Sequence, residues 1–128
     1  MKFFLSDAGI GSVSDVFLIL LLILLVVILL ESVVMLIFKI NNFWKSFIHS
    51  ACVNICSTIA GYVILSQNFF NEKISSLGQW FIFFAITIVI EGLLMMLLYT
   101  KMPRARLWLV TLVMNIVSYL FLYLIILF

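Results

Sequence analysis

The stretch WFIFFAITIVIEGLLMMLLYT, residues 80–100, decides the fold because it carries a single charged residue, Glu91, in a long apolar run. A bilayer's hydrocarbon core is about 30 Å thick, and about 20 helical residues cross it. Backbone groups in lipid must be bonded within the chain, and this run lacks the alternation of a barrel strand. Residues 80–100 are therefore predicted to form a transmembrane helix, with Glu91 inside the membrane.

Three further runs have the same character, at residues 16–38, 46–66 and 107–128. The 128 residues are 67% hydrophobic and 9% charged, whereas a soluble domain is roughly half apolar and about a quarter charged. The sequence predicts an all-α integral membrane protein with four transmembrane helices in a single membrane domain, residues 1–128. The remaining segments are too short for a soluble domain, so we expect no enzymatic activity, no cofactor and no metal.

The basic residues predict the orientation of the helices. Most of them fall in the short loops after the first and third helices: Lys39, Lys45, Lys101, Arg104 and Arg106. Only Lys2 and Lys73 fall in the segments at the opposite ends of the predicted helices. Short cytoplasmic loops are enriched in Lys and Arg, so both loops are predicted to be cytoplasmic, with the N- and C-termini outside a bacterial inner membrane. Their side chains are expected to anchor lipid headgroups rather than to bind nucleic acid.

The two halves of the chain share a pattern of rare polar residues. Residues 31–57 read ESVVMLIFKINNFWKSFIHSACVNICS, and residues 91–118 read EGLLMMLLYTKMPRARLWLVTLVMNIVS. Each segment has a Glu, a short basic loop and then Asn-x-x-Ser, at nearly equal spacings. We interpret this as two parallel helical hairpins, covering about residues 16–66 and 80–128, of the kind found in membrane proteins with internal repeats.

Helical geometry places the polar residues of both halves at one depth. At about 1.5 Å per residue, Glu31, Asn54, Glu91 and Asn115 all lie well inside the cytoplasmic edge, so each Glu can meet the Asn of its hairpin. Ser57 and Ser118 share the face of the two Asn residues. Small residues that let membrane helices approach closely extend this pattern: Ser50, Gly61, Thr87, Gly92 and Thr111.

Two roles for the glutamates remain open from sequence. A charged side chain at this depth costs about 3 kcal/mol, and protonation or pairing with Asn and Ser removes most of that cost. The glutamates either cross-link the helices through Asn54 and Asn115, or they carry protons or bind a cation.

The second predicted helix also carries a pattern that could bind a metal, but the sequence supports it less well than the glutamate cluster. His49, Cys52 and Cys56 lie on one helical face, a spacing that zinc or copper ligands can use. One helix supplies only these three residues, so we interpret them as packing residues.

The hairpin pattern of residues 31–57 and 91–118 resembles that of small uncharacterised four-helix proteins of bacterial inner membranes, for which no activity is known. The chain also resembles the small multidrug transporters, which have four helices and a Glu in the first helix. It departs from them in its second Glu and its internal repeat, so their mechanism is not transferred.

The sequence therefore leaves three functions. The first is a non-enzymatic subunit, or an assembly or stabilising component, that associates with itself or with other membrane proteins in the lipid bilayer. The second is an oligomeric channel or transporter for protons or small cations that uses Glu31 and Glu91. The third is an immunity or defence protein of the cell envelope.

Overall fold

Four long helices make up the computed structural model, which describes residues 13–66 and 76–127. They are α2 (Val13–Ile37), α3 (Phe43–Ser66), α4 (Ser76–Leu98) and α5 (Arg104–Leu127). All four are long and apolar enough to cross a membrane. The prediction of an all-helical chain with four such helices is thus confirmed. The N-terminal segment and the central loop, with Lys2 and Lys73, lie outside the described residues.

The helices begin three or four residues before the apolar runs. For α3 and α5, residues outside those runs start the helix. Asn42 precedes α3, and its side-chain oxygen accepts a hydrogen bond from the backbone N–H of Lys45 at 3.0 Å, which is an N-cap. Pro103 precedes α5, and its carbonyl accepts the N–H groups of Arg106 and Leu107. At the end of α2, Lys39 adopts a positive φ of 51°, as residues that terminate helices commonly do.

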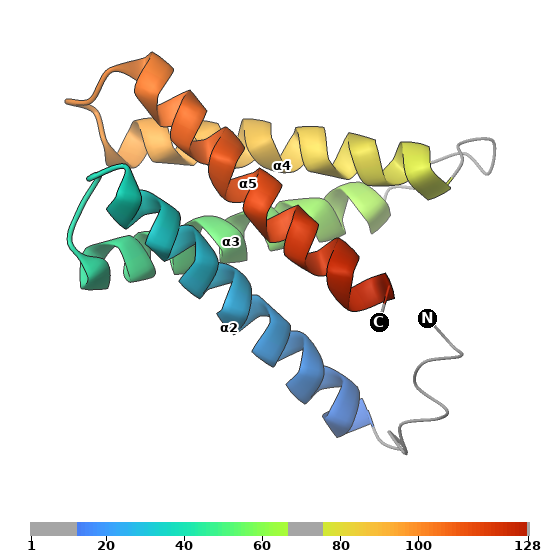
Figure 1. Cartoon of the computed structure of the whole chain (residues 1–128). Helices are drawn as coiled ribbons and strands as arrows, with labels where there is room; N and C mark the ends of the chain where they lie inside the picture. The colour runs from blue at the N-terminus through green and yellow to red at the C-terminus, as the bar shows by residue number, and fades with distance from the viewer. Residues whose placement is uncertain (1–12, 67–75, 128) are drawn as a thin grey trace.

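The chain forms two hairpins, α2–α3 and α4–α5, whose turns lie at the same end of the molecule (Figure 1). Each helix packs against two others: α2 and α4 both contact α3 and α5. Among the described residues, α2 does not contact α4, and α3 does not contact α5. The four helices therefore form a ring in which every helix lies between one helix of its own hairpin and one of the other.

The apolar core lies in the half of the ring nearest the turns. Met35, Met95 and Met114, one each from α2, α4 and α5, are fully buried there together with Val110. Gly92 permits close packing in this region, since a Cβ atom at this position would lie 2.3 Å from the ring of Trp108.

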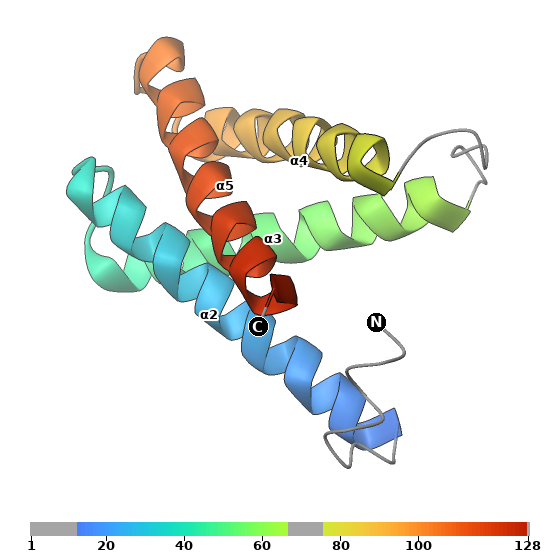
Figure 2. The same ribbon diagram turned by 45° about the vertical axis from the view of Figure 1, so that its right-hand side comes forward.

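Away from the turns the helices spread apart, as both views show (Figures 1 and 2). Residues 13–26 of α2 include no buried side chain. Tyr119 of α5 makes edge-to-face contacts with Trp80 and Phe84 of α4, with ring centroids 5.0 and 4.9 Å apart. The half of the ring distant from the turns is therefore open mainly on the side of α2, while aromatic side chains still join α4 to α5.

Candidate functional site

Both glutamates of the predicted spans lie in the interior of the ring. Glu31 of α2 and Glu91 of α4 are each 1% exposed. The ring geometry places each carboxylate between α3 and α5, so it can receive hydrogen bonds from both hairpins.

Glu31 accepts hydrogen bonds from three side chains. Ser50 Oγ donates to Oε2 at 2.9 Å, and Asn54 Nδ2 donates to the same oxygen. Both donors lie on α3, in the same hairpin as Glu31. Ser118 Oγ, on α5 of the other hairpin, donates to Oε1 at 2.9 Å.

Glu91 has the corresponding arrangement with the hairpins exchanged. Asn115 Nδ2, from its own hairpin, donates to Oε2 at 2.7 Å. Ser57 Oγ, from α3 of the first hairpin, donates to Oε1 at 2.9 Å. Each asparagine thus binds the glutamate of its own hairpin, and each serine binds the glutamate of the other.

The two halves of the cluster differ at one position. Ser50 reaches Glu31, whereas Thr111, the residue that precedes Asn115 by one turn, donates to the backbone carbonyl of Leu107 in its own helix at 3.0 Å. Glu31 therefore has one donor more than Glu91.

The cluster borders a partly open cavity of about 700 Å³ that extends from the glutamates away from the turns. Its walls are mainly apolar and aromatic, with residues from all four helices, including Phe17, Tyr62, Phe83 and Tyr119. Glu31, Glu91, Asn54 and Asn115 lie at its inner end together with the two serines. The carboxylates are therefore buried from the surface but adjoin a space that a small ion could enter.

No cationic side chain balances the charge of these carboxylates among residues 13–66 and 76–127, because every donor to them is an amide or a hydroxyl. A buried ionised carboxylate without a counter-charge is strongly unfavourable. The cluster therefore needs a proton or another cation to offset its charge.

Two of the expected packing residues occupy other environments. Thr87 Oγ1 donates to the carbonyl of Phe83 and also pairs with Tyr119 Oη at 3.1 Å, so it links α4 to α5 at the cavity wall. Gly61 is an exception to the predicted close helix packing. It lines the cavity, and a Cβ atom there would have no neighbouring atom within 4 Å, because the helices diverge at that level.

The basic side chains that were expected to act as anchors gather around the two turns. All five are exposed there: Lys39, Lys45, Lys101, Arg104 and Arg106. Arg106 has a further contact, because its Nη2 donates to the backbone carbonyl of Phe38 at 2.5 Å and so joins the second hairpin to the first.

The side chains of the possible metal site are not engaged in a common site. His49 Nδ1 pairs with the hydroxyl of Tyr99, which also accepts a bond from Asn41 Nδ2 at 3.4 Å. Cys52 and Cys56 are exposed, free thiols.

Sequence reasoning missed the two tyrosines in these networks. Tyr99 falls at the end of an apolar run, and Tyr119 lies within another. Neither belongs to the repeated pattern of Glu, Asn and Ser, so spacing gave no signal for them.

Comparison with protein-family profiles, with curated proteins and with solved structures finds no match to this chain.

Proposed function

We propose that this chain is a non-enzymatic, multi-pass membrane protein that binds and carries protons or small cations at Glu31 and Glu91. The observation that supports this best is that both buried carboxylates adjoin the cavity of about 700 Å³. Glutamates that only cross-link helices need hydrogen-bond donors, but they need no cavity that leads to them. A site that takes up and releases a cation needs both.

The side chains around the glutamates can keep their hydrogen bonds when a glutamate gains or loses a proton. A serine hydroxyl can donate or accept a hydrogen bond, and a carboxyl group does the same once it is protonated. Ser57 and Ser118 can therefore keep their bonds to Glu91 and Glu31 when a proton arrives or leaves. Intramembrane carboxylates that face a cavity are commonly part of ion or proton paths.

The proposed setting is a bacterial inner membrane with the two turns in the cytoplasm. The basic residues around the turns favour this orientation by the positive-inside rule. In that orientation the cavity opens toward the outer side of the membrane, and the N- and C-termini lie outside.

Filling the cavity tests the proposal without changing the carboxylates. The purified protein is reconstituted in liposomes, and the flux driven by a proton or Na⁺ gradient is measured. We expect wild-type flux above the leak of protein-free liposomes. Gly61→Phe is expected to reduce that flux strongly, because Gly61 borders the cavity with open space around it.

Ile59→Phe is the matched control, since Ile59 lies on the same helix, is 58% exposed and does not border the cavity. It adds an aromatic ring outside the ring of helices and is expected to leave the flux unchanged. Equal effects of the two variants, or no flux in the wild-type protein under either gradient, would refute the carrier proposal.

A second candidate is a subunit of a larger membrane complex. The observation behind it is that residues 13–26, the first half of α2, have no buried side chain, so this part of the helix is open to another helix as well as to lipid. A helix of another membrane protein, or of a second copy of this chain, can cover such a segment.

Gentle extraction from native membranes, followed by mass determination, tests the subunit candidate. A stable complex with other proteins supports it. A pure monomer or homo-oligomer, isolated from the membrane in which the protein is naturally produced, contradicts a role as a subunit of a complex with other proteins.

A further inference from the structure

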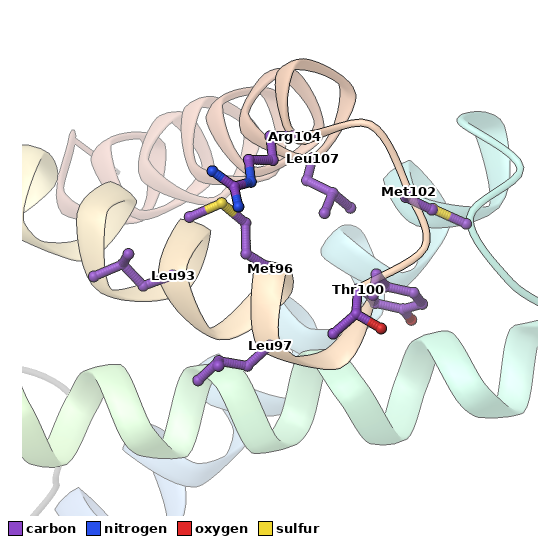
Figure 3. Close-up of a pocket in the computed structure, with 8 residues that line it drawn as sticks. Leu93, Met96, Leu97, Thr100, Met102, Arg104 and Leu107 are labelled. Carbon is purple, nitrogen blue, oxygen red and sulfur yellow. The ribbon is translucent and has the colours of Figure 1, made fainter.

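A second cavity lies near the turns, apart from the glutamate cluster. It is a groove of about 600 Å³ formed by the last turns of α4, the turn after it and the start of α5. Figure 3 shows the side chains that line it. None of them also lines the cavity at Glu31 and Glu91.

One wall of the groove is an apolar strip along α4. Leu93 and Leu97 are 50% and 74% exposed, and Met96 lies between them in sequence and lines the same groove. On a membrane-spanning helix, an apolar strip next to a turn lies at the edge of the hydrocarbon core. It is therefore at the depth of the first carbons of a lipid acyl chain and can pack against them.

The other wall carries a positive charge without a partner. Arg104 extends over the groove beside Met96 (Figure 3). Within the described parts of the chain, Arg104 has no hydrogen-bond or ion-pair partner, and no acidic side chain lines the groove. Arg104 is also the first residue of α5, so the positive end of the helix dipole adds to the charge of its guanidinium group.

We propose that this groove binds an anionic phospholipid, with its phosphate at Arg104 and one acyl chain along Leu93 and Leu97. A guanidinium group binds phosphate oxygens well. A free phosphate ion gains nothing from the apolar strip, and a lipid without an anionic group gains nothing from Arg104. The quaternary amine of a zwitterionic headgroup meets the positive charge of Arg104 and of the start of α5 here. An anionic headgroup therefore fits best.

The test compares two variants that remove the same charge from the same turn region. The full-length protein in neutral detergent is titrated with phosphatidylglycerol or phosphatidylcholine, and bound lipid is counted by native mass spectrometry. Arg104→Gln is expected to weaken phosphatidylglycerol binding about tenfold, the effect of losing a direct hydrogen bond between charged groups. Lys101→Gln is the control, since Lys101 does not line the groove. It removes only a screened surface charge and is expected to change binding less than about twofold.

Two further measurements identify the ligand as a lipid. Wild-type protein is expected to prefer phosphatidylglycerol to phosphatidylcholine, and soluble glycerophosphoglycerol, which lacks acyl chains, is not expected to displace the bound lipid. Equal losses in the two variants would show general surface attraction instead of a site. Unchanged binding in Arg104→Gln, equal binding of the two lipids, or displacement by the soluble headgroup would also overturn the proposal. None of these outcomes depends on ion flux through the glutamate cluster.

Discussion

Replacing Glu31 and Glu91 together by glutamine is expected to reduce ion flux in liposomes to the leak of protein-free vesicles, while the protein stays folded. Glutamine has the shape of glutamate, and its amide oxygen can still accept the bonds from Ser118 and Ser57. An amide cannot bind and release a proton in the physiological range, and it offers a cation no negative charge. The substitution therefore removes the proposed chemistry and keeps the bonds from Ser118 and Ser57. The new amide nitrogen is a donor, so Asn54 and Asn115 must turn their side-chain amides to accept from it.

The control for this experiment is Asp15→Asn, which removes an acidic group in the first turn of α2, distant in sequence from the cluster. It is expected to leave the flux at the wild-type level. Circular dichroism and the elution volume in detergent report whether each variant is folded. A folded double-glutamine variant that transports at the wild-type rate would show that the glutamates have no part in carrying ions.

Replacing Glu31 by leucine is expected to lower the free energy of unfolding by about 2 kcal/mol, and more than Glu91→Leu does. Leucine accepts no hydrogen bond, so Ser50, Asn54 and Ser118 lose their shared acceptor. Interhelical hydrogen bonds in membrane proteins average about 0.6 kcal/mol, so the loss of three such bonds gives about 2 kcal/mol. Each donor keeps a backbone carbonyl as a second acceptor, so no unpaired donor adds to this loss. Glu91→Leu removes the acceptor of only two side-chain donors, Asn115 and Ser57.

The stability comparison is made by thermal unfolding in detergent, and the reference for each leucine variant is the glutamine variant at the same position. Each glutamine variant is expected to unfold at a higher temperature than its leucine counterpart, because glutamine keeps the serine bonds. If Glu31→Leu proves as stable as Glu31→Gln, the hydrogen bonds to Glu31 do not stabilise the fold. The presence of Glu31 is then explained only by its proposed role in carrying ions.

The helices could be predicted because the number of apolar residues needed to cross a bilayer is a strong constraint on sequence. Their first turns were missed because the residues that start them, such as Asn42 and Pro103, are polar or turn-forming and lie outside the apolar runs. An apolar run reports what can lie in lipid, whereas a helix begins where its first N–H groups find acceptors.

The contacts of Glu31 with Asn54 and of Glu91 with Asn115 were foreseen because depth along a helix and the facing side both follow from residue spacing. The exchange of Ser57 and Ser118 between hairpins was not, since it depends on which helices are neighbours around the ring. The cavity could not be predicted either, because its size depends on the angles at which the helices cross. Residue spacing along the sequence does not determine those angles.

The exchanged serines also bear on how such a chain could arise. A lone hairpin has a glutamate and an asparagine that can bond, but its Ser57 or Ser118 has no partner glutamate within that hairpin. Two copies of one hairpin, related by a two-fold axis, supply each other with the missing group. Joining them end to end in a single gene requires no new contact at the site. The second copy is then free to change elsewhere, as the contact between His49 and Tyr99 illustrates, because the corresponding residues of the other hairpin lack these side chains.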